Sequence, residues 1–100
     1  MSTPFRELEA ASLAAMTPDE RARFDAALEE EEARLHVAEI VYQARAAAGL
    51  TQAALAERIG TKQSVISAIE NGSQMPTIPT LRRIARAMDR RLNIELAAAG

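Results

Sequence analysis

Four polar side chains follow a glycine within seven residues. Lys62, Gln63, Ser64 and Ser67 come after Gly60, in a segment whose apolar residues recur at helical spacing. At the start of a helix that lies in the major groove of DNA, such groups hydrogen-bond to base edges: glutamine pairs with adenine N6 and N7, lysine reaches guanine O6 and N7, and serine serves either. These four residues are therefore candidates for reading a DNA sequence.

Two short helices are needed to present these side chains. We predict a first helix that Thr51 caps and Gly60 ends, and a second helix that Thr61 caps and that ends before Asn71. Glycine supplies the left-handed backbone of a tight turn, and the small Ala56 permits a close crossing of the two helices. The residues expected to form their shared core are Leu55, Ile59, Ile66 and Ile69. This arrangement is that of a helix-turn-helix.

A longer helical region precedes this pair. Thr17 is a good N-cap, Pro18 suits the first helical position, and Glu20 completes a capping box, so we expect a helix to begin here. No helix breaker follows until Gly49. The sequence leaves open whether residues 18–48 form one helix or two.

The two ends of the chain have weaker patterns. Residues 4–16 have a thin apolar stripe that indicates a short amphipathic helix, Thr77 is expected to cap a helix after the central pair, and residues 91–96 alternate as in a strand. The expected fold is all-α: a five-helix domain with an N-terminal helical arm and a short C-terminal strand for dimerisation. We expect the arm in residues 1–34, the helix-turn-helix domain in 35–90, and the strand with its tail in 91–100.

The charges are distributed unevenly along the chain. Residues 1–36 have four arginines against nine acidic residues, a net charge of −5. The other 64 residues have eight basic residues against five acidic ones, a net charge of +3. This asymmetry indicates two surfaces with different partners, one a basic molecule and the other nucleic acid.

Composition argues against several other function classes. The chain has no cysteine, a single histidine (His36) and no phosphate-binding glycine loop, so we expect no enzyme, no cofactor and no metal site. Glu29–Glu32 fit a solvated charge run better than a metal site, because consecutive acids on a helix point in different directions. No apolar run approaches a membrane span and the N-terminus has no signal-peptide pattern. We therefore expect a cytoplasmic protein without a membrane partner.

Residues 37–90 resemble the phage-repressor type (XRE family) of helix-turn-helix domain. The residues that carry the resemblance are Arg45, Gly49-Leu50-Thr51-Gln52, Leu55-Ala56, Gly60, Ile66, Ile69-Glu70-Asn71-Gly72, Pro76 and Leu81. The resemblance implies a structural ion pair between Arg45 and Glu70. It also implies phosphate contacts from Gln52, Thr61, Asn71 and Ser73. Such modules act as dimers on palindromic operators in double-stranded DNA.

The whole architecture resembles the HigA-type antitoxins, which pair with a basic, RelE-like ribonuclease toxin and repress their own operon. The anchors expected in the arm are Phe5, Leu8, Leu13, Met16, Phe24 and Leu28. Leu92, Ile94 and Leu96 are expected to pair two copies through the strand. For the arm residues the alternatives are packing within one chain or an added dimer contact, and for the strand they are packing within its own chain or disorder.

Two further questions stay open from the sequence. A stand-alone XRE repressor without a toxin is the alternative function, and a protein-binding adaptor would leave Lys62 and Gln63 without a purpose. The arginines near the C-terminus are either phosphate contacts or solvated surface residues; they are Arg82, Arg83, Arg86, Arg90 and Arg91.

Overall fold

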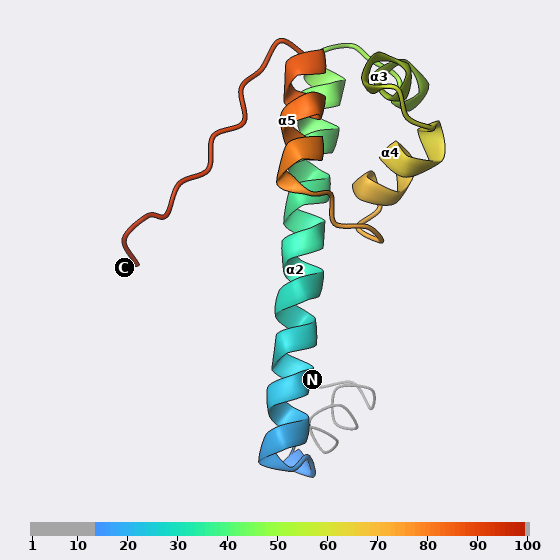
Figure 1. Ribbon diagram of the computed structural model, residues 1–100. Helices are drawn as coiled ribbons and strands as arrows, with labels where there is room; N and C mark the ends of the chain where they lie inside the picture. The colour runs from blue at the N-terminus through green and yellow to red at the C-terminus, as the bar shows by residue number, and fades with distance from the viewer. Residues whose placement is uncertain (1–13, 100) are drawn as a thin grey trace, which may run out of the picture. The chain divides into compact units, whose positions relative to one another are not determined.

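The computed structural model describes residues 14–99, and within this range it has four α-helices and no strand (Figure 1). The helices are α2 (Pro18–Ala47), α3 (Gln52–Ile59), α4 (Gln63–Glu70) and α5 (Ile78–Ala87). The chain divides between Glu32 and Ala33 into two units. The second unit contains the end of α2 together with α3, α4 and α5.

Helix α2 is continuous, so residues 18–47 form one helix and not two. It begins where the capping residues predicted, because the Thr17 hydroxyl oxygen accepts a hydrogen bond from the backbone N–H of Glu20 at 3.2 Å. Glu29–Glu32 do not interrupt the helix. All four side chains are exposed, and solvation reduces the repulsion between like charges on one helix.

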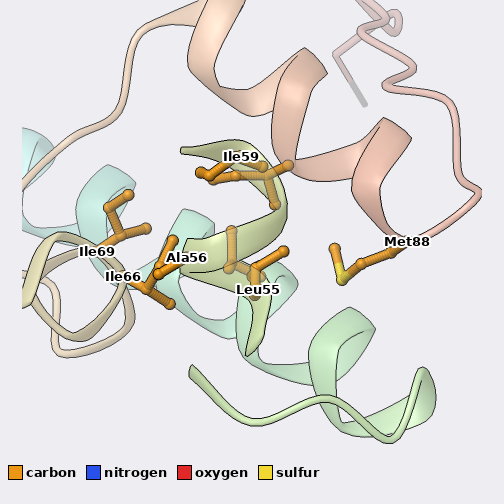
Figure 2. Close-up of a cluster of buried hydrophobic side chains, with 8 residues drawn as sticks. Leu55, Ala56, Ile59, Ile66, Ile69 and Met88 are labelled. Carbon is orange, nitrogen blue, oxygen red and sulfur yellow. The ribbon is translucent and has the colours of Figure 1, made fainter. Parts of the chain in front are cut away.

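The hydrophobic core of the second unit is formed by all four helices (Figure 2). It consists of Val41, Leu55, Ala56, Ile59, Ile66, Ile69, Ile84 and Met88. Leu55 and Ile66 are fully buried. Burial of one such side chain stabilises a fold by about 1.5–3 kcal/mol. The four core residues expected of the helix pair are thus confirmed, and the core fixes α3 against α4.

The turn between α3 and α4 has the expected glycine geometry but a different cap. Gly60 ends α3 in a left-handed conformation, with φ of 69°. At the other end of α3, Thr51 is the N-cap as expected, because its hydroxyl oxygen accepts a hydrogen bond from the N–H of Ala54 at 3.0 Å. The N-cap of α4 is Lys62, which has an extended backbone and makes no side-chain capping bond. The prediction that Thr61 caps this helix is therefore wrong by one residue. Thr77 caps α5 as expected, through a 3.2 Å bond from the N–H of Thr80.

The prediction of a C-terminal strand is wrong. After α5 the backbone turns at Asp89, which has a positive φ of 54°, and residues 90–99 have no regular secondary structure. A strand needs a second strand for its backbone hydrogen bonds, and the described part of this chain offers only helices. The expected fold of five helices with a strand is thereby corrected to four helices within residues 14–99. Most of the helix expected over residues 4–16 lies outside the described residues.

Candidate nucleic-acid interface

The four side chains expected to read bases lie at the solvent-facing side of α4. Lys62, Gln63 and Ser64 are exposed at its N-terminal end, and Ser67 is half-buried one turn later. The opposite side of the helix is anchored by the core residue Ile66. The buried side of α4 therefore fixes the helix, and its first turn faces the solvent, as the reading of DNA bases requires.

Gln63 takes part in a chain of side-chain hydrogen bonds that runs back into the fold. Its Nε2 donates to Oε1 of Gln52 at 3.4 Å, and Nε2 of Gln52 donates to Oε1 of Glu70 at 3.3 Å. Both bonds are long and individually weak. Because an amide has two N–H donors and a carbonyl acceptor, Gln63 keeps one N–H and its oxygen free to pair with adenine. Gln52, expected at a phosphate, orients Gln63 in this conformation.

The ion pair between Arg45 and Glu70 joins α2 to the end of α4. Nε and Nη2 of Arg45 donate to the two carboxylate oxygens at 2.7 and 2.8 Å, and Nη1 donates to the carbonyl of Leu50 at 2.8 Å. The side chains are 14% and 5% exposed. The hydrogen bond with Glu70 raises the pKa of Arg45 above its ordinary value. The Arg45 guanidinium also lies 5.4 Å from the centre of the Tyr42 ring. This geometry fits a structural pair, because both carboxylate oxygens of Glu70 and three nitrogens of Arg45 form hydrogen bonds within the fold.

In the loop after α4, Asn71 and Ser73 differ in whether their side chains have a free hydrogen-bond donor for a phosphate. The Asn71 side-chain oxygen accepts from the N–H of Ser73 at 2.9 Å, which leaves the amide NH₂ free. The Ser73 hydroxyl donates to the carbonyl of Ala68 at 3.2 Å, so its single proton is already engaged. The N–H groups of Ser73 and Gln74 also donate to the Ala68 carbonyl. In this conformation Asn71 is the better phosphate donor of the two. Thr61 is half-buried.

Two arginines hold α3 and α5 together through contacts that sequence reasoning did not predict. Nη1 of Arg58 donates to the carbonyl of Ala87 at 2.8 Å, and Nη2 of Arg83 donates to the carbonyl of Ile59. The acceptors are backbone groups 29 and 24 residues away. No side-chain pattern marks such an acceptor, which explains why both contacts were missed.

Four other arginines form an exposed basic cluster beside the C-terminal segment. Arg82, Arg86, Arg90 and Arg91 line a surface hollow of about 470 Å³ together with Leu92. No ion pair between these four and an acidic residue occurs in residues 14–99. Their positive charge is thus not neutralised by the part of the fold that the structure describes.

The residues expected to bind partners are partly within the described range. Leu28 is 41% exposed and Phe24 and Met16 are half-buried, whereas Phe5, Leu8 and Leu13 lie outside the described residues. Leu92 lines a groove of about 630 Å³ beside α2 and α5. Ile94 and Leu96 are 59% and 99% exposed.

The described residues contain neither a metal-binding cluster nor a membrane-spanning helix. No three or more His, Asp or Glu side chains in residues 14–99 are grouped so that they could hold a metal ion. None of the described helices combines the length and the apolar character that a membrane crossing needs.

Helix α4 exposes polar residues at its first turn, and α3 holds it across a left-handed glycine turn. This arrangement defines the DNA-binding helix-turn-helix class. Residues 41–94, more than half of the chain, match the family model described as helix-turn-helix. The chain therefore belongs to this helix-turn-helix family of DNA-binding regulators, which confirms the resemblance to XRE-type domains at the level of the family.

Two kinds of relative are similar to this chain. An uncharacterized HTH-type transcriptional regulator of Methanothermobacter thermautotrophicus is 41% identical over 51 residues, which are 51% of this chain and 74% of the relative. Antitoxin HigA1 of Mycobacterium tuberculosis, in two strains, is 33% identical over 73 residues, which are 73% of this chain and 49% of the antitoxin. The chain thus matches about half of the length of the antitoxin.

Proposed function

We propose that this protein is a sequence-specific DNA-binding antitoxin. As a homodimer it binds a palindromic operator and represses its own operon, and through its acidic N-terminal segment it neutralises a basic RelE/HigB-like ribonuclease toxin. The alternative is a stand-alone XRE-family repressor that has no toxin partner.

The observation that best supports the DNA-binding role is that Gln63 is exposed and that its side-chain amide is oriented by hydrogen bonds. The residue is exposed at the first turn of α4, and its amide is linked through Gln52 to Glu70, a carboxylate that is itself fixed by Arg45. Even weak bonds that favour one orientation reduce the conformational entropy that a reading side chain loses on binding. Lys62, Ser64 and Ser67 are proposed as further base contacts, and Gln52, Thr61, Asn71 and Ser73 as the phosphate set.

A dimer is proposed because a single recognition helix reads too few base pairs to be selective. The exposed apolar side chains of Ile94 and Leu96 support the C-terminal segment as a contact between copies. Their exposed surface favours burial against a partner.

The toxin-binding role is supported by the net charge of −5 in residues 1–36 and by the similarity to Antitoxin HigA1. A surface of this sign attracts a basic protein over distances of about 10 Å, the screening length at moderate salt. Within that acidic region, the proposed anchors among the described residues are Met16, Phe24 and Leu28.

The DNA-binding role is tested by Gln63→Ala on the duplex that footprinting of the upstream region identifies. We expect a loss of about 1–3 kcal/mol, confined to the specific site, because one bidentate base contact is removed. Gln43→Ala is the matched control: Gln43 is an exposed glutamine on α2 whose side chain donates to Glu39. An unchanged ratio of specific to nonspecific affinity in Gln63→Ala would refute the assignment of Gln63.

The toxin role is tested separately by co-expression with the product of the adjacent gene. We expect the two proteins to co-purify, and the double variant Phe24→Ala with Leu28→Ala to lose the partner while it still binds the operator. Operator binding without any co-purifying partner would favour the stand-alone repressor.

A further inference from the structure

Two neighbouring residues of α2 contact the loop that follows the recognition helix α4. Nε of Arg34 donates to the carbonyl oxygen of Gly72 at 3.1 Å, and this contact is partly buried. Leu35 lies against the same glycine: a Cβ at position 72 would be 2.7 Å from Cδ2 of Leu35. Gly72 also has a φ of 79°, which side-chain-bearing residues rarely adopt. The loop therefore passes close to α2 at a point where only glycine fits without strain.

The peptide plane between Gly72 and Ser73 links this contact to Asn71. The carbonyl of Gly72 accepts from Arg34, and the N–H of Ser73, on the opposite side of the same planar unit, donates to the Asn71 side-chain oxygen at 2.9 Å. The N–H of Ser73 also donates to the carbonyl of Ala68 at 3.0 Å, so rotation of this plane would break all three bonds together. The bond from Arg34 therefore helps to fix the direction in which the free NH₂ of Asn71 points.

We propose that Arg34, supported by Leu35, is a positioning residue for the phosphate contact of Asn71. It sets the affinity of the protein for DNA without touching DNA, and this role rests on the proposed operator binding. Arg34 is the last residue of the segment that the sequence assigned to the arm. Its contact with Gly72 assigns it instead to the DNA-binding unit.

The experiment is a double-mutant cycle in the full chain with Arg34→Ala, Asn71→Ala and the combined variant. Affinity for the operator duplex is measured over a range of salt concentrations, and folding is checked by circular dichroism. Arg34→Ala should weaken binding about three- to tenfold, the range expected for one lost hydrogen bond. The slope of log affinity against log salt should stay unchanged, because Asn71 is uncharged and neutralises no phosphate, whereas a fall of about 0.9 would mean that Arg34 itself contacts a phosphate and would overturn the positioning role. The ratio of specific to nonspecific affinity should stay unchanged, because phosphate contacts do not read sequence.

The double variant distinguishes positioning from direct contact. If Arg34 acts through Asn71, the combined variant should bind no more weakly than Asn71→Ala alone. Arg34→Lys keeps a donor for the Gly72 carbonyl and should recover part of the affinity. Arg23→Ala is the control, since Arg23 is an exposed arginine on the same helix. If Arg34→Ala fails to fold, Arg34→Met provides the same comparison, because it keeps an unbranched stem but has no donor for the Gly72 carbonyl.

The outcomes separate this inference from the proposed function. If the wild-type chain binds the operator and Arg34→Ala binds equally well, or if the losses from Arg34→Ala and Asn71→Ala add, the positioning role is overturned while DNA binding stands. If the wild-type chain binds no duplex at low salt, the proposed DNA-binding function fails, and the role of Arg34 fails with it.

Discussion

The arginines of the second unit fall into two sets with different surroundings. The inner arginines donate to acceptors on another helix or on the connection between helices; they are Arg34, Arg45, Arg58 and Arg83. The outer arginines Arg82, Arg86, Arg90 and Arg91 line a hollow and form no ion pair within the described residues. Arg82 and Arg83 are adjacent in the chain yet belong to different sets, because successive residues of a helix point about 100° apart. The surroundings of an arginine, and not its type, decide whether it stabilises the fold or is free for a partner.

The sharpest test of this comparison is Arg45→Ala. It leaves the carboxylate of Glu70, which is 5% exposed, without its cation, and we expect a loss of about 3–5 kcal/mol in the free energy of unfolding. Urea denaturation of the full chain measures it. A loss no larger than that of a surface variant such as Arg86→Ala would show that the inner set is not structural.

A smaller effect is expected for Arg83→Ala. The carbonyl of Ile59 loses its donor at the end of α3, and one neutral acceptor costs about 1 kcal/mol when its hydrogen bond is removed. Arg82→Ala is the matched control one residue away, and thermal unfolding should separate the two. Equal stability of the two variants would contradict the assignment of Arg83 to the inner set.

The smallest effect is expected for the outer arginines. Arg86→Ala should change the free energy of unfolding by no more than about 0.5 kcal/mol, as for surface positions in general. The double variant Arg82→Ala with Arg86→Ala should unfold at the same urea concentration as the wild-type chain. A marked destabilisation would mean that these side chains have structural partners and that the two sets are not distinct.

The local features of the fold could be predicted from the sequence. Thr51, Thr77 and Gly60 act through their own backbone neighbours, and each has the predicted role. The buried positions Leu55 and Ile66 follow from helical periodicity. The position of the α4 cap was missed by one residue, since Thr61 and Lys62 are adjacent and the choice depends on the backbone of the turn.

Features that depend on distant partners could not be predicted. The acceptors of Arg34, Arg58 and Arg83 are backbone carbonyls that carry no side-chain signal. The alternation in residues 91–96 predicted a strand. Periodicity shows only which residues would share a face, and it does not show whether a second strand is present to pair with. The family resemblance supplied the Arg45–Glu70 pair, and the structure has this pair.

The hydrogen bonds from Gln63 through Gln52 to Glu70 have a consequence for retargeting. Glu70 also accepts both bonds from Arg45, so the orientation of the reading amide and the attachment of α2 to α4 share one carboxylate. A carboxylate introduced by Gln63→Glu would place a second negative charge beside Gln52. The side-chain amide of Gln52 would then have to rotate to offer that carboxylate an N–H. We therefore expect a library that varies positions 52 and 63 together to contain more variants with an aligned reading side chain than a library that varies position 63 alone.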